Sequence, residues 1–147
     1  MKTRTIKLCV QSTEAPEFID ITDQLHRCVE GSGVQNGFVV VFSKHTTAAI
    51  KINENEPLLL KDMARFLERI ASRNGYYQHN DFSVRTVNMT EGECPNGHAH
   101  CQHLMLGASE TIPIVEGLLH LGRWQKVFLV ELDRPREREV ILQIVGE

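Results

Sequence analysis

The sequence of 147 residues lacks any apolar run that is long enough to cross a membrane. A membrane-spanning helix needs about 18 consecutive apolar residues, and no stretch approaches that length. The N-terminus, Met1-Lys-Thr-Arg-Thr5, leads into alternating polar and apolar residues and has no apolar core of the kind found in signal peptides. We therefore expect a cytoplasmic protein without a membrane partner.

Excess positive charge is lacking as well. The net charge is −3 at pH 7, so no overall basic field steers the protein onto nucleic acid, and we expect no nucleic-acid partner. The segment Arg134-Pro-Arg-Glu-Arg138 is locally basic, but a turn of this kind is more often simply solvated. No dense cluster of arginine and lysine and no paired-aspartate magnesium motif stands out.

Paired cysteines and the common catalytic motifs are missing too. Cys9, Cys28, Cys94 and Cys101 show no C-x-x-C spacing, so free thiols are expected, although Cys94 and Cys101 lie close enough to histidines to act as ligands. The sequence contains no G-x-G-x-x-G, no P-loop, no G-x-S-x-G and no internal repeat. What remains is an ordinary globular composition, 41% hydrophobic and 24% charged, whose length fits a single domain over 1–147.

Apolar periodicity predicts alternating strands and helices in the first half of the chain. The expected strands cover 3–11, 18–21, 37–42 and 48–53. A first helix is capped by Asp20 or Thr22 and closed by Gly31-Ser-Gly33. A second helix has Asn55 as its cap, Pro57 in its first turn and Asn74-Gly75 as its end.

The second half is predicted to be mainly strand. Residues 76–95 read as a loop, after which Asn96 caps a short helix that ends at Gly107. The expected strands cover 110–115, 118–121, 126–133 and 139–145. Together these elements predict an α+β fold, in which a compact, mostly antiparallel sheet or curled sandwich packs with two or three helices.

Candidate chemistry begins where the strand at 37–42 ends, in His45-Thr46-Thr47. Two hydroxyls and the nearby backbone N–H groups can hold an anionic oxygen, with the imidazole as donor, base or ligand. The alternative is that threonine simply favours strands and that His45 caps a strand end. Asn53-Glu54 reaches the same region if the strands at 37–43 and 48–53 are antiparallel neighbours. Glu54 then orients an imidazole or acts as acid or base, unless it caps the following helix.

Three histidines crowd into Asn96-Gly-His-Ala-His-Cys-Gln-His103. On a helix His100 and His103 share a face, whereas on an extended segment His98 and His100 do. No regular element aims all three at one ion, so a metal site would have to recruit His45 or His79 from elsewhere. The alternative is one functional histidine and two solvated ones.

Seven segments, in order over nearly the whole chain, resemble the YjbQ family. They are His45-Thr-Thr-Ala48, Ile52-Asn-Glu-Asn55, Tyr77-Gln-His79, Asn96-Gly-His-Ala-His100, Leu106-Gly-Ala-Ser-Glu-Thr-Ile-Pro113, Leu121-Gly-Arg-Trp-Gln125 and Val130-Glu-Leu-Asp-Arg-Pro-Arg136. The resemblance implies a compact α+β domain, a homotrimer with clefts near subunit boundaries, and secondary thiamine-phosphate synthase activity. That reaction joins a pyrimidine pyrophosphate to a thiazole phosphate and releases pyrophosphate.

The resemblance also implies site residues. The catalytic candidates are His45, Glu54 and His100. The substrate-binding candidates are Thr46, Thr47, Asn53, Asn96, Ser109, Trp124 and Gln125, to which we add His98 from the histidine cluster. His45, His79 and His100 form a convergent imidazole set that suits a divalent metal such as Zn or Mg.

The chain departs from the family pattern in several places. Residues 80–95 are longer than expected, His98 occupies a variable position, and Arg123, Lys126 and Arg134 replace smaller residues. Two other functions use the same residues. One is a metal-dependent hydrolase or transferase acting on another phosphorylated small molecule. The other is a non-enzymatic, trimeric ligand-binding module.

Overall fold

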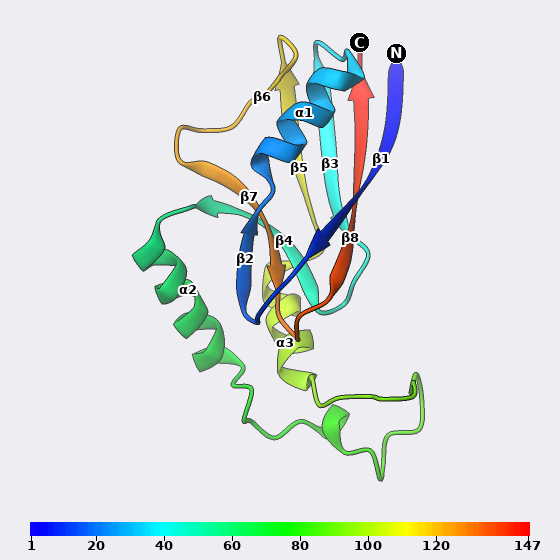
Figure 1. The fold of residues 1–147 in the computed structure, drawn as a ribbon, viewed down its shortest axis with the longest axis vertical. Helices are drawn as coiled ribbons and strands as arrows, with labels where there is room; N and C mark the ends of the chain where they lie inside the picture. Colours follow the sequence, from blue (N-terminus) through cyan, green and yellow to red (C-terminus); the bar gives the residue numbers. More distant parts are fainter.

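Strands in which buried and exposed residues alternate form two antiparallel sheets that face each other. The computed structural model describes residues 1–147 and confirms the predicted α+β class (Figure 1). The five-stranded sheet has the order β1-β8-β3-β5-β6 and the three-stranded sheet the order β2-β7-β4. The strands are β1 (Lys2–Gln11), β2 (Glu17–Asp20), β3 (Gly37–Ser43), β4 (Ala48–Glu54), β5 (Ser109–Val115), β6 (Leu118–Leu119), β7 (Gln125–Glu131) and β8 (Glu137–Gly146).

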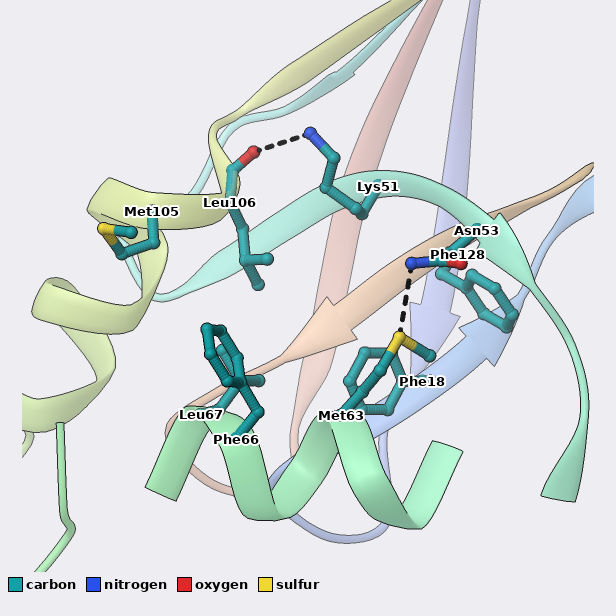
Figure 2. Close-up of a pocket in the computed structure, with 9 residues that line it drawn as sticks. All are labelled: Phe18, Lys51, Asn53, Met63, Phe66, Leu67, Met105, Leu106 and Phe128. Carbon is teal, nitrogen blue, oxygen red and sulfur yellow. Dashed lines mark hydrogen bonds between the residues drawn. The ribbon is translucent and has the colours of Figure 1, made fainter. Parts of the chain in front are cut away.

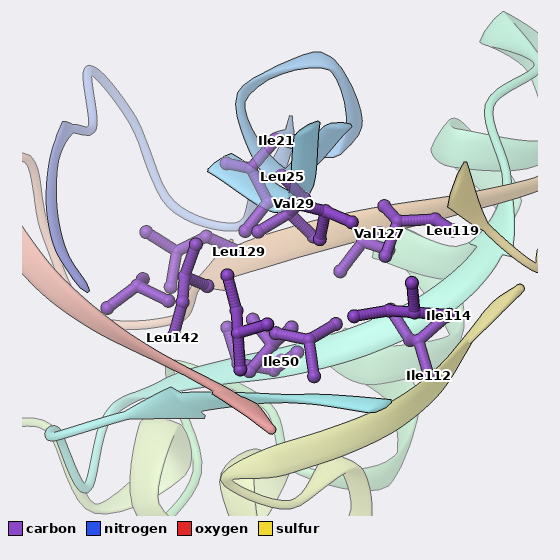
Figure 3. Packing of buried hydrophobic residues seen from close by; sticks show 14 of the residues in the cluster. Ile21, Leu25, Val29, Ile50, Ile112, Ile114, Leu119, Val127, Leu129 and Leu142 are labelled. Carbon is purple, nitrogen blue, oxygen red and sulfur yellow. The ribbon is translucent and has the colours of Figure 1, made fainter. Parts of the chain in front are cut away.

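The main core lies between the two sheets, because every second residue of each strand points inward. In β3, Val39 and Val41 are fully buried, whereas Phe38 and Phe42 point outward and stay partly exposed. Figure 3 shows Ile50 and Leu129 of the smaller sheet packed in the same cluster as residues of the larger sheet and of helix α1 (Thr22–Ser32). Burial of this aliphatic cluster is the dominant contribution to the stability of the fold.

A second, smaller core covers the other face of the three-stranded sheet. Along β7, Val127 and Leu129 enter the main core, while Phe128 and Val130 enter the second cluster with Leu67 of helix α2 (Pro57–Ile70). A strand that is apolar on both faces is therefore explained by layers on both sides. The helices are α1 (Thr22–Ser32), α2 (Pro57–Ile70) and α3 (Gly97–Leu106), and Gln78–Asn80 form a short 3₁₀ turn, η1. None of the helices has the length and apolar character that a membrane crossing requires.

The helix ends correct two predictions and refine a third. Helix α1 closes on Gly33 in the left-handed conformation (φ 68°), as expected. Ile21 holds its N-cap position without a side-chain bond, and the predicted Asp20 acts one residue earlier, where its Oδ1 accepts from the backbone N–H of Thr22 at 2.9 Å. Helix α2 is capped by Glu56, which accepts hydrogen bonds from the backbone N–H groups of Leu58 and Leu59, and it ends at Ala71. Asn55 is not the cap because its amide is turned toward Asp20, to which it donates at 3.0 Å.

The main correction to the predicted topology is that β3 and β4 do not pair with each other. β3 pairs with β5 and β8, and β4 pairs with β7 in the other sheet. The segment at 44–47 therefore crosses from one sheet to the other and is no hairpin turn. Asn53 and Glu54 consequently stand at the far end of β4 from His45.

Candidate functional site

A polar cleft of about 480 Å³ opens where the chain crosses between the sheets. Its walls come from the crossing segment 44–47, from η1 and the loop after it, from the start of α3, and from the chain around the start of β8. No hydrophobic side chain lines it. The lining residues are Lys44, His45, Thr46, Thr47, His79, Arg85, Asn88, Thr90, Glu93, Asn96, His100, Arg136 and Arg138.

Cations dominate this lining, since Glu93 is its only carboxylate. The other carboxylates stand behind the cations. Glu139 pairs with Lys44 at 2.7 Å, and it also pairs with Lys7, so that these two ammonium groups lower the pKa of Glu139 to about 2. Such an arrangement fixes the cations in place while it leaves donors and positive charge facing the cleft.

The deepest of these pairs joins Arg138 to Glu131, both almost fully buried. Glu131 also accepts hydrogen bonds from Ser12 Oγ at 2.9 Å and from the backbone N–H of Asp133 at 3.0 Å. Burial alone would raise the pKa of this carboxyl, but the hydrogen bonds outweigh it and the pKa lies below its usual value. A buried ion pair is tolerated only when its remaining lone pairs are satisfied in this way.

Thr47 connects this pair to the cleft. Its Oγ1 accepts from Arg138 at 2.9 Å and from Arg136 at 3.2 Å. Arg136 is anchored in addition by Asp133. Burial and the neighbouring Arg138 lower the pKa of Arg136, so an anion placed beside it would relieve repulsion between the two guanidinium groups.

His45 is held by the backbone. The N–H of Glu139 donates to Nε2 of His45 at 2.8 Å, so this imidazole is neutral and carries its proton on Nδ1. Burial, reinforced by Arg138 and Arg136, lowers its pKa below the usual 6.5. His45 therefore offers the cleft an N–H donor.

His79 and His100 lie edge to face, with ring centroids 4.6 Å apart. Asn80 brings them together, because its Oδ1 accepts from the backbone N–H groups of Asn96 (3.0 Å) and Gly97 (2.9 Å) and so caps α3. Gly97 is required here, since a Cβ at that position would meet Tyr77 at 2.5 Å. Burial and then His79 lower the pKa of His100 below 6.5, which keeps that ring neutral at neutral pH.

Asn96 stands at the predicted cap position of α3, but its side chain makes no capping bond. Its amide donates instead to Asp133 at 3.3 Å, beneath the cleft. The capping role falls to Asn80, a residue sixteen positions earlier. Asn96 thus links the start of α3 to the carboxylate that anchors Arg136.

The imidazoles do not fit a three-histidine metal centre in this arrangement. In the chain as described, no three side chains of His, Cys, Asp or Glu are grouped so as to hold an ion. The physical reason is clear for His45, whose single free lone pair is already used by the Glu139 N–H. Cys94 and Cys101 are exposed, free and absent from the cleft lining.

The remaining predicted site residues lie elsewhere. Ser109 is exposed at the start of β5, and His98 is buried, 2% exposed, outside the cleft lining. Glu54 pairs in register with Gln125, and Trp124 is exposed beneath the guanidinium of Arg123. Glu54, at the end of β4, stands about 20 Å from the start of that strand, at about 3.3 Å per residue. Asn53 lies beside it and donates to Met63 Sδ at 3.4 Å.

Sequence reasoning missed the cations. The sequence predicts a solvated turn at Arg136 and Arg138, and it carries no signal that Lys44 or Arg85 belongs to a site. The alternation of Arg136 and Arg138 at the start of a strand is the one available signal, because residues two apart share a face. Their buried partners, Glu131 and Asp133, come from the preceding strand and turn, and no local pattern announces that pairing.

A family model described as "UPF0047 protein YjbQ-like" matches residues 6–147. The chain belongs to the YjbQ family. One YjbQ relative, a "UPF0047 protein" of Methanothermobacter thermautotrophicus, is 36% identical over 147 residues, covering 100% of this chain and 95% of its own. Another, YugU of Bacillus subtilis, is 31% identical and covers 95% of this chain and 97% of its own.

Solved structures agree with the fold of this YjbQ chain. A YjbQ-like protein of unknown function from Sulfolobus solfataricus superposes with a TM-score of 0.89, is 37% identical and covers 99% of both chains. A family member from Clostridium acetobutylicum gives a TM-score of 0.83 at 35% identity over 95% of this chain and 99% of its own. The curled antiparallel sheets and three helices are therefore a property of the family.

Proposed function

We propose that the cationic cleft binds the phosphate groups of a small phosphorylated substrate and that the protein is a transferase of the secondary thiamine-phosphate synthase type. The observation that carries this proposal is the set of cations around a wholly polar cleft. Lys44, Arg136 and Arg138 pair with carboxylates outside its lining, and Arg85 pairs with Glu93 within it at 3.2 Å. Preorganised cations and donors are what the departure of pyrophosphate demands.

The chemistry asks little else of the protein. The ring nitrogen of the thiazole phosphate attacks the methylene carbon of the pyrimidine pyrophosphate, a C–N bond forms, and the C–O bond to pyrophosphate breaks with its electron pair on the leaving oxygen. The nucleophile has no proton to lose, so no base is required. Arg136, Arg85 and Lys44 neutralise the leaving group, while Thr46 and the Nδ1–H of His45 donate to its oxygens.

The test is to mix purified protein with the two half-substrates, with and without added Mg²⁺ or Zn²⁺, and to measure thiamine phosphate. Arg136→Met should lower pyrophosphate affinity by about 10- to 100-fold, the worth of a charge-assisted hydrogen bond. Arg123→Met, at the exposed Trp124, is the matched control and should bind as wild type. Absence of product under all metal conditions would contradict the thiamine assignment. Unchanged pyrophosphate binding in Arg136→Met would contradict the proposal that the cleft binds the phosphate groups.

A second candidate is a hydrolase acting on another phosphorylated small molecule, and neutral His100 favours it as a general base for water. Release of phosphate from a panel of phosphate esters, abolished in His100→Ala, would support this reading over the synthase. The predicted divalent metal remains a test condition in both assays. Thermal stabilisation by phosphate esters without turnover would indicate a ligand-binding module.

The homotrimer and the cytoplasmic location also remain proposals. The uncovered face of the five-stranded sheet supports an assembly, because it exposes large apolar side chains. Each of three such residues is more than 40% exposed: Phe38, Phe42 and Val115. Light scattering coupled to size exclusion should give three times the mass of 16.7 kDa. A monomer at micromolar concentration would contradict the assembly, and cell fractionation tests the location.

A further inference from the structure

A second pocket, of about 300 Å³, lies between α2 and the outer face of the three-stranded sheet. Figure 2 shows side chains converging on it from β2, β4, β7, α2 and the end of α3. Seven of its nine lining residues are hydrophobic, among them Phe18, Phe66, Phe128, Met63 and Met105. Its chemistry is the opposite of that of the cationic cleft.

We propose that this pocket binds an uncharged, one- or two-ring apolar molecule that carries a single hydrogen-bond acceptor. The volume lies at the lower end of the range for small-molecule pockets, about 300–1,000 Å³, so the ligand is small. Aromatic rings and thioethers together favour a flat, polarizable ligand, because sulfur–ring and edge-to-face contacts add to burial. This inference does not rest on the function proposed for the cleft.

The two polar residues of the lining define the acceptor. The amide of Asn53 donates to Met63 Sδ at 3.4 Å, and a thioether is a weak acceptor, so an oxygen can displace it with a gain. Lys51 uses two of its three donors on Glu110 (2.7 Å) and on the Leu106 carbonyl (3.2 Å). The ammonium of Lys51 is directed toward Leu106 (Figure 2), so the amide of Asn53 supplies the N–H donor that faces the pocket.

The charge of the ligand follows from the same contacts. Lys51 is the only charged side chain that lines the pocket, and Glu110 and the Leu106 carbonyl already occupy two of its three donors. An anion would bring a second negative charge to one ammonium group and would lose its own hydration among apolar walls. An uncharged carbonyl compound meets neither obstacle.

Calorimetric titration of the purified protein with three matched probes tests the proposal. Acetylnaphthalene has two rings and one carbonyl acceptor, naphthalene lacks the acceptor, and naphthoate carries a charge. We expect acetylnaphthalene to bind at least about tenfold more tightly than either comparator. Asn53→Ala should reduce its advantage over naphthalene. Equal affinity for all three probes, or no binding by any of them, would overturn the proposal.

Two variants fix the location. Met63→Trp and Met105→Trp each fill the pocket from a different helix and should abolish acetylnaphthalene binding. Leu58→Trp, at an exposed position of α2 outside the lining, is the control and should bind as wild type. Thermal unfolding shows whether each variant is folded. If one of the two tryptophan variants does not fold, the other provides the test. Binding that survives in a folded Met63→Trp or Met105→Trp variant would place the ligand elsewhere and overturn the assignment.

Discussion

The two ends of β4 present surfaces of opposite character. At its start, the cationic cleft is built from charged groups whose carboxylate partners are buried behind them, as in Arg138 with Glu131. Near its end, the apolar pocket is built from rings and thioethers, and its one charged residue, Lys51, pairs with a partly exposed Glu110. The same kind of ion pair therefore serves as a structural element in one region and as a surface feature in the other.

Removal of one partner of the buried pair should have the largest effect. Arg138→Met leaves the Glu131 carboxylate buried without its cation, which typically costs about 3–5 kcal/mol. The free energy of unfolding from urea denaturation is the measurement. In the double variant Glu131→Gln/Arg138→Met part of the loss should be recovered, since position 131 no longer carries an unpaired charge and the new amide oxygen can still accept from Ser12 and from the Asp133 N–H. A single variant within 1 kcal/mol of wild type, where about 1 kcal/mol is a typical mutational effect, would show that the pair does not organise this end.

Loss of the Asn80 cap should have a smaller effect. Asn80→Ala leaves the N–H groups of Asn96 and Gly97 without their acceptor, and loss of a helix cap costs about 0.5–2 kcal/mol. It also releases His79 from its place beside His100, so the affinity for pyrophosphate should fall together with stability. Asn55→Ala, at the position where the sequence predicted a cap, should change the free energy of unfolding less. Equal losses in the two variants would contradict the assignment of the cap.

The comparison also shows which features the sequence can predict. The strands and α1 were predicted because alternation and helical spacing are local signals, as in Val39 and Val41 of β3. The segment at 44–47 lines the cleft, and the sequence points to it as a candidate site, but its role as a crossover between sheets depends on long-range pairing. Glu131 and Arg138 form one unit across a turn, and neither residue alone differs from an ordinary surface charge. Electrostatic organisation of this kind becomes apparent only in three dimensions.

The pH dependence of stability should arise at the cleft and not at the apolar pocket. Burial lowers the pKa of four histidines, His45, His98, His100 and His103. Two of them, His45 and His100, line the cleft, and none lines the apolar pocket. Each is neutral in the folded protein, whereas in the unfolded chain it takes up a proton near pH 6.5. The contribution of these neutral histidines to the free energy of unfolding is therefore fully present above pH 6.5 and is lost as the pH falls below that value. His45→Gln keeps an acceptor for the Glu139 N–H but does not titrate, and it should make this loss shallower. His120→Gln, at an exposed position, is the control. Identical urea midpoints above and below pH 6.5 in the wild type would contradict the assignment.

The smallest effect on stability is expected from Lys51, the one charged residue that lines the apolar pocket. Lys51→Met removes the same kind of cation as Arg138→Met, but its ammonium and the Glu110 carboxylate are 39% and 25% exposed as side chains, so water screens the pair. An exposed pair contributes about 0–1 kcal/mol, and the stem of methionine preserves the packing of the lysine chain. The free energy of unfolding should therefore change by less than about 1 kcal/mol, and this change should become smaller as salt is added, because salt screens exposed pairs. A loss as large as that of Arg138→Met would mean that both ends of β4 depend on ion pairs, and the contrast between them would then lie in exposure alone.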